Sequence, residues 1–171
     1  QTKTYGTAVG ASSTQFTSSG LQNGETIGTV TLTSGGLAAT AHVSGSPYSV
    51  TPGAATGGTF TAGDYTITYN NASTGLTVSP AALGVTASNQ TKTYGTAFTF
   101  NGTEFTSSGL QNGETIGTVT LTSSGTPATA HVSGSPYAIT CSAATGATFT
   151  GGDYTLTYNH ASTGLTVNPA A

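Results

Sequence analysis

Charged side chains are nearly absent from this sequence. Of its 171 residues, two are lysine, none is arginine and five are aspartate or glutamate, so 4% are charged and the formal net charge is −3. Average soluble proteins carry about 25% charged residues. Two lysines cannot neutralise a run of phosphates, which excludes nucleic-acid binding. No apolar stretch approaches the roughly 20 residues that a membrane-spanning helix needs.

The residues of the common reactive centres are also scarce. Cys141 is the single cysteine, so no disulfide can form within the chain. Its alternation with Tyr137 and Ile139 predicts a buried, inert thiol. Zinc needs three or four clustered ligands, which Cys141 and the three histidines, His42, His131 and His160, do not supply. No serine lies in a Gly-x-Ser-x-Gly elbow.

What the sequence does contain is a near-identical internal repeat. Thr2–Ala8 returns as Thr91–Ala97, a shift of 89 residues. The same shift aligns residues 1–82 with residues 90–171 without a gap, and 18 of the 82 aligned positions differ, so about 78% are identical. A period of this length fits a small domain rather than a solenoid repeat. We therefore predict two tandem domains, residues 1–82 and 83–171.

The segment Leu83–Asn89 joins the two copies. Leu83, Val85 and Ala87 alternate with small or polar residues, which predicts the opening strand of domain 2. Domain 1 has no such strand, and an edge without it exposes backbone and part of the core. We expect the chain to be a window of a longer repeat array. Residues before Gln1, or a neighbouring chain, would then supply a strand resembling Leu83–Asn89.

Threonine, 39 of the 171 residues, marks the strands. Apolar residues alternate with threonine in Thr29–Thr33, Tyr65–Tyr69 and Leu76–Val78 and in their second copies. This period of two places apolar side chains on one face and threonine on the other. We predict a mostly β fold of two elongated Ig-like β-sandwiches, or alternatively a β-grasp arrangement, with at most one helical turn per domain.

Further expectations concern loops and core. Asn70–Gly75 is interpreted as a hairpin loop joining the last two strands, and Ser19–Ile27 could hold the helical turn. The aromatic residues are expected to form the core. In domain 1 these are Tyr5, Phe16, Tyr48, Phe60, Tyr65 and Tyr69.

Four segments of the second copy resemble the MBG family, glycine-rich repeat domains of large bacterial surface proteins that are related to the YDG type. These segments are Asn89–Gly95, Ser108–Thr115, Gly152–Tyr158 and Gly164–Pro169. The resemblance spans essentially the whole repeat and implies an extracellular, β-rich module of adhesin-like proteins. It brings no catalytic residues, and its mucin-binding association identifies no pocket.

The acidic residues and lysines allow two chemical hypotheses. Glu25 with Asp64 could formally form a glycosidase pair, but their recurrence as Glu114 and Asp153 favours a role in the fold, and Glu104 has no counterpart. An isopeptide bond could join Lys3 to Asn70 with help from Asp64, and Lys92 to Asn159 with help from Asp153. Solvated lysines are the simpler expectation.

The function expected from the sequence is structural. We predict a repeat module of an extracellular bacterial surface protein that forms part of a stalk or filament in adhesion, with lateral self-assembly into filaments as a further hypothesis. A glycan- or mucin-binding module is the alternative. Ice binding by threonine arrays is less economical because sandwich strands twist. We expect no enzyme activity, metal, cofactor or nucleic-acid partner.

Overall fold

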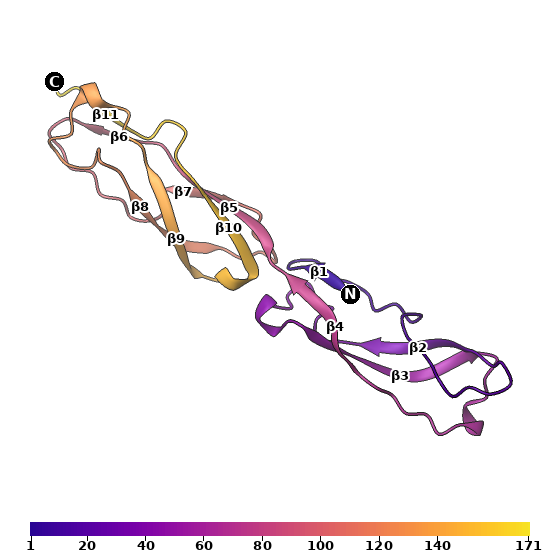
Figure 1. The fold of residues 1–171 in the computed structure, drawn as a ribbon. Coiled ribbons are helices and arrows are strands. Elements are labelled where there is room, and N and C mark those ends of the chain that lie inside the picture. Colours follow the sequence, from indigo (N-terminus) through magenta and orange to yellow (C-terminus); the bar gives the residue numbers. More distant parts are fainter. The chain divides into compact units, whose positions relative to one another are not determined.

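The computed structural model describes all 171 residues, which form two compact units, Gln1–Pro80 and Ala81–Ala171 (Figure 1). The fold is mostly β, as predicted, with 41% of residues in strands and no α-helix. Each unit has two three-residue 3-10 turns, one more than expected: Val43–Gly45, Ala62–Asp64, Val132–Gly134 and Gly151–Asp153. No helix has the length and apolarity needed to cross a membrane.

Unit 1 contains a single four-stranded sheet with the order β1-β4-β3-β2. Its strands are β1 (Thr2–Thr4), β2 (Ile27–Thr33), β3 (Tyr48–Gly58) and β4 (Ala72–Ser79). β1 runs parallel to β4, and the other neighbours are antiparallel.

Unit 2 contains seven strands in three sheets. They are β5 (Ala81–Ala87), β6 (Gln90–Thr93), β7 (Phe105–Ser108), β8 (Ile116–Thr122), β9 (Thr140–Ala147), β10 (Tyr154–Asn159) and β11 (Leu165–Asn168). β5 lies between β10, to which it is parallel, and β7, to which it is antiparallel. β6 pairs in parallel with β11, and β8 pairs antiparallel with β9. β5 begins at Ala81, two residues before the segment identified from the sequence.

Period-two patterning forms these strands, but aliphatic residues dominate the core. The most deeply buried large side chains include Leu76, Leu83, Val85, Ile139 and Leu165. Of the six aromatic residues expected in the core of unit 1, Tyr5 alone is buried. Phe16, Tyr48, Phe60 and Tyr65 are half-buried, and Tyr69 is 40% exposed. The expectation of an aromatic core is therefore wrong, because most of these rings lie at the margins of the core.

Two local predictions are also wrong. Asn70–Gly75 is not a hairpin loop, because β4 begins at Ala72, and in unit 2 the last two strands pair with β5 and β6 rather than with each other. Ser19–Ile27 forms no helical turn. It holds a tight turn in which the Glu25 N–H donates to the Gln22 carbonyl and Asn23 has a φ of 52°.

Two segments of identical or near-identical sequence form strands in unit 2 but not in unit 1. Tyr154–Asn159 is β10, whereas its counterpart, residues 65–70, is not a strand. Phe105–Ser108 is β7, whereas Phe16–Ser19 is not a strand. In unit 2 both segments pair with β5, and unit 1 contains no strand at that position. Strand formation here depends on the partner, since a strand needs a neighbour for its backbone hydrogen bonds.

Glycines 20 and 109 provide a matched test of this difference. Both have positive φ, 85° and 100°, but a Cβ on Gly109 would lie 2.3 Å from the Ala82 carbonyl oxygen, whereas a Cβ on Gly20 would meet nothing within 4 Å. Gly109→Ala should displace β5 in addition to the backbone strain of about 1–3 kcal/mol that both substitutions incur. In urea titrations followed by resolved NMR amides of each unit, Gly109→Ala should cost more stability in unit 2 than Gly20→Ala costs in unit 1. Equal losses would contradict the assigned role of β5.

Candidate functional site

No three His, Cys, Asp or Glu side chains gather where they could hold a metal ion. His42 stacks on Tyr5 and His131 on Tyr94, each with ring centroids 5.9 Å apart. His160 is exposed, and its counterpart is Asn71. His42 and His131 thus make equivalent packing contacts, each with a tyrosine of its own repeat.

Cys141 is buried on β9, as its alternation with Ile139 predicts. Its Sγ lies 3.5 Å from the Val85 carbonyl and 3.3 Å from the Asn159 carbonyl, on β5 and β10. The counterpart in unit 1 is Pro52, which cannot make these contacts. Cys141 therefore packs against a strand that unit 1 does not contain.

Glu25 and its repeat Glu114 organise a turn. The Tyr65 hydroxyl donates to the Glu25 carboxylate and accepts the Gln22 N–H at 3.0 Å. This bond to Glu25 raises the pKa of Tyr65 above its ordinary value. Tyr154 makes the same pair of contacts in unit 2, with Glu114 and Gln111. The conserved geometry of the two copies gives these carboxylates a structural role.

Glu104, which has no acidic counterpart in unit 1, closes the loop before β7. Its carboxylate accepts the N–H groups of Asn101, Gly102 and Thr103 at 2.9–3.1 Å. Burial would raise the pKa of Glu104, but these backbone hydrogen bonds outweigh it and hold that pKa below its ordinary value.

The two lysines are buried, which corrects the expectation that they are solvated. Lys3 is 6% and Lys92 7% exposed. The Lys3 Nζ donates to the carbonyls of Thr7, at 3.0 Å, and Ala38. The Lys92 Nζ donates to Thr96, at 3.1 Å, and Pro127. Burial lowers the pKa of Lys3 below its ordinary value. Lys3 thus ties β1, and Lys92 ties β6, to two loops through backbone oxygens.

The proposed isopeptide partners point elsewhere. Asn159 lies at the end of β10, where its Nδ2 donates to Thr86 Oγ1 at 3.3 Å. Asn70 lines a cavity that does not include Lys3. Asp64 is exposed, whereas Asp153 is buried. Both lysine Nζ atoms therefore donate to backbone carbonyls and not to an asparagine side chain.

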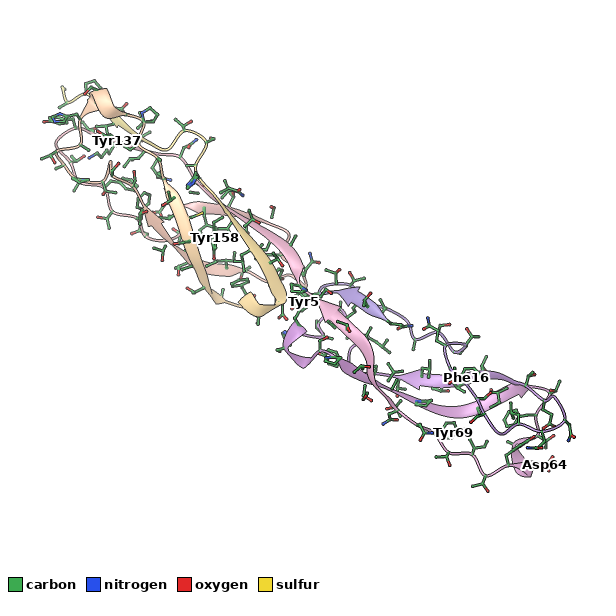
Figure 2. The ribbon with its side chains drawn as sticks, viewed as in Figure 1. Tyr5, Phe16, Asp64, Tyr69, Tyr137 and Tyr158 are labelled. Carbon is green, nitrogen blue, oxygen red and sulfur yellow. The ribbon has the colours of Figure 1, made fainter.

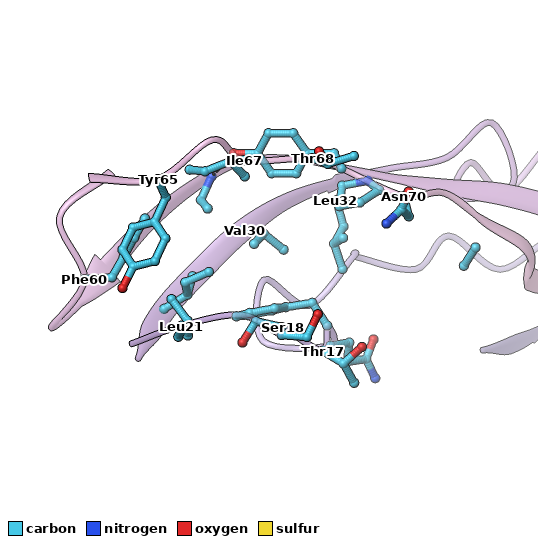
Figure 3. A pocket seen from close by; sticks show the side chains of 18 of the residues that line it. Thr17, Ser18, Leu21, Val30, Leu32, Phe60, Tyr65, Ile67, Thr68 and Asn70 are labelled. Atoms are coloured by element: carbon cyan, nitrogen blue, oxygen red, sulfur yellow. Dashed lines mark hydrogen bonds between the residues drawn. The ribbon is translucent and has the colours of Figure 1, made fainter. Parts of the chain in front are cut away.

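Unit 1 contains a groove with a volume of about 710 Å³. One wall is the segment Phe16–Ser19 and the other is Tyr65–Asn70, while Val30, Leu32 and Val50 lie at its floor. Figure 3 shows Val30 and Leu32 between Thr17 and Ser18 on one side and Ile67 and Thr68 on the other. Figure 2 labels a ring from each wall, Phe16 and Tyr69. We call this surface the unit 1 groove.

The chemistry of the unit 1 groove is that of a binding surface. Its lining is apolar and hydroxyl-bearing, and it contains no acidic, basic or histidine side chain. Sequence reasoning anticipated an exposed edge in domain 1 but identified no lining residues. No sequence signal identifies them, because they are the counterparts of β7 and β10, whose pairing with β5 is seen only in the structure.

Comparison with known families adds one finding. The family model described as "MBG domain (YGX type)" matches residues 83–166. The chain thus carries an MBG domain. No curated protein sequence and no solved structure matches the chain. MBG domains are typical of bacterial surface proteins, so the match suggests a repeat module of such a protein.

The matched residues of the MBG domain include Tyr94-Gly95-Thr96. Gly95 has a φ of 90°, which favours glycine, and its N–H donates to the Ala128 carbonyl at 3.1 Å. This turn places the Thr96 carbonyl beside Lys92. In unit 1 Gly6 has a φ of 87° and donates to Ala39 in the same way. The tyrosine-glycine turn of both copies therefore builds the buried lysine site.

We expect the chain to contain no isopeptide bond. Both lysine Nζ atoms are held by backbone carbonyls, and each bond to asparagine would release one ammonia. Mass spectrometry of the denatured protein should therefore give the mass of the unmodified sequence. A Lys92→Met variant, which cannot crosslink domain 2, serves as the control and should differ by the substitution alone. A mass lower by one or two ammonia in the parent chain would contradict this expectation.

Proposed function

We propose that the chain is a structural repeat module that forms part of a stalk or filament in bacterial adhesion, with each repeat an Ig-like sandwich. The observation that carries this proposal is the parallel pairing of N-terminal with C-terminal strands in each unit. In unit 1, β1 pairs with β4, and in unit 2, β5 and β6 pair with β10 and β11.

Parallel terminal strands suit a module that is pulled from its ends. In unit 2, Ala81 lies opposite Tyr154 and Thr86 opposite Asn159, after which Gln90 lies opposite Leu165 and Thr93 opposite Asn168. The chain therefore enters the unit at one end of the paired strands and leaves at the other. Tension along the chain would load all these hydrogen bonds together, by sliding one strand along the other, and not one after another.

The surface chemistry also supports a structural role. Exposed threonines of neighbouring strands lie within hydrogen-bonding distance of each other, for example Thr29 with Thr56 at 3.2 Å and Thr118 with Thr145 at 3.4 Å. Such cross-strand pairs stabilise a sheet without charge. A weakly charged surface avoids non-specific electrostatic binding, which suits a spacer exposed to many molecules.

The exposed aromatic residues favour this role over glycan binding. Tyr69 and Tyr94 are each 40% exposed. Their counterparts differ, since Tyr158 is half-buried and Tyr5 is buried. The Tyr69 hydroxyl is also engaged, because it accepts the Ala55 N–H at 2.9 Å. A glycan-binding repeat would be expected to present the same aromatic platform in both copies.

Single-molecule force spectroscopy tests the proposed role. Unit 2 pulled through the ends of the chain should resist more force than unit 2 pulled through Thr118 and Thr145, which are paired across the antiparallel β8 and β9. The first direction shears the parallel pairs at once, whereas the second separates strands bond by bond. Both attachments would be made in the same Cys141→Ser background so that handle chemistry is matched. Equal or lower force from the ends would overturn the stalk proposal.

A glycan array gives an independent readout. We expect the chain to bind mucin-type glycans no better than a Tyr69→Ser, Tyr94→Ser double variant, because no aromatic platform is repeated. Binding by the parent chain that the double variant loses would favour a glycan-binding module instead.

A further inference from the structure

The unit 1 groove occupies the position that β5 fills in unit 2. The floor residues Leu32 and Val50 and the neighbouring Pro52 are half-buried. Their counterparts Leu121, Ile139 and Cys141 are buried, at 9%, 0% and 8% exposure. Cys141 Sγ contacts the Val85 carbonyl directly. These positions are therefore buried in the unit that contains β5 and half-buried in the unit that does not.

The walls of the unit 1 groove have the sequence of strands but lack a partner. Residues 65–70 differ from β10 only at Ile67, which is Leu156, and residues 16–19 are identical to β7. In unit 2 these two strands do not pair with each other, because β5 lies between them. The unit 1 groove is therefore bordered by two segments whose sequences form strands when β5 is inserted.

Both ends of the unit 1 groove retain the features that hold β5. Gly109 lets the Ala82 backbone approach, and its counterpart Gly20 has open space at the Cβ position. Asn89, just after β5, accepts the N–H groups of Thr163 and Gly164 at 2.8 and 2.9 Å. The counterparts Thr74 and Gly75 are present in unit 1. A second cavity of about 240 Å³ shares Leu32, Val50 and Ala72 with the groove and extends to Gly75.

We propose that the unit 1 groove binds an extended segment with the sequence of Ala81–Asn89, supplied as the connecting segment of another repeat of this type. The segment would run parallel to residues 65–70 and antiparallel to Phe16–Ser19. In the register of unit 2, Leu83 lies opposite Ile67, Val85 opposite Tyr69 and Ala87 opposite Phe16.

The chemistry of the ligand follows from this register. The groove takes a strand of alternating pattern, in which the leucine and the valine face the floor. In unit 2 these two residues of β5, Leu83 and Val85, are 1% and 0% exposed. A glycine between them fits without any shift, whereas a Cβ on Gly84 would lie 3.0 Å from Ser108 Oγ, the counterpart of Ser19. This interaction does not depend on the stalk role, since it requires only strand binding.

Hydrogen exchange on the intact chain tests the proposal. The probe is a synthetic peptide with the sequence of Ser79–Gln90, added in excess, and the readout is the exchange of amides 65–70 and 16–19. Binding should slow their exchange at least about tenfold, which corresponds to roughly 1.4 kcal/mol. Amides of β10 and β7 serve as the internal reference and should not change.

A second measurement covers the case in which a separate peptide binds the chain too weakly to protect its amides. The segment of residues 81–89 is fused directly ahead of Gln1, where the repeat period places it, and should protect the same amides. Protection by the peptide, or by the fused segment alone, supports the proposal. No protection in either case overturns it.

Two matched controls separate insertion from general stabilisation. A peptide with Leu83→Thr and Val85→Thr keeps strand propensity but loses the apolar side chains, and it should not protect. The Gly20→Ala chain places a methyl group where the segment's backbone would pass, and it should lose the protection by the parent peptide. Undiminished protection in both controls would show that the peptide acts elsewhere and would overturn the proposal.

Discussion

Unit 2 of this protein depends on one short strand at the boundary between the sequence repeats. β5 supplies backbone partners to β7 and β10 and buries Leu83 and Val85 almost completely. Burying a leucine or a valine stabilises a fold by about 1.5–3 kcal/mol, against a net stability of roughly 5–15 kcal/mol for a whole domain. The two units show the effect within one chain. Where β5 is present its neighbours are strands and the floor is closed, and where it is not the same sequences border a groove.

The scarcity of charge determines how the few ionisable groups are used. Lys3 and Lys92 are buried and hold loop carbonyls, and Glu25 and Glu114 each hold a tyrosine hydroxyl. A buried lysine is costly unless its donors are satisfied, so these contacts account for the recurrence of the tyrosine-glycine turn beside it. Threonine pairs take over the outer faces of the strands. Both lysines and Asp153 are buried and the three glutamates are half-buried, which leaves Asp64 as the one exposed charged side chain and the surface nearly neutral.

The sequence predicted the class of structure better than its details. Period-two alternation identified β2, β4 and β8, and the repeat register pointed to the strand that unit 1 does not contain. Tyr65–Tyr69 could not be assigned correctly from alternation, because its state depends on a partner distant in sequence. The aromatic core and the solvated lysines were wrong for a related reason. Tyrosine and lysine have long apolar stems with polar tips, and the position of each tip is decided by carbonyl and carboxylate groups that only the fold brings near.

The second copy of the aligned sequence begins at Gln90, whereas the second folding unit begins at Ala81. The sequence repeat and the folding unit are therefore offset from one another. β4 ends at Ser79 and β5 begins at Ala81, so Pro80 alone separates the last strand of one unit from the first strand of the next. Proline has no N–H to donate, which makes it a natural point for the chain to leave one sheet and join another. A strand that is covalently continuous with one unit thus completes the core of its successor. In unit 2 the central strand β5 lies ahead of the aligned repeat that begins at Gln90, so the folding of unit 2 requires the segment that precedes that repeat.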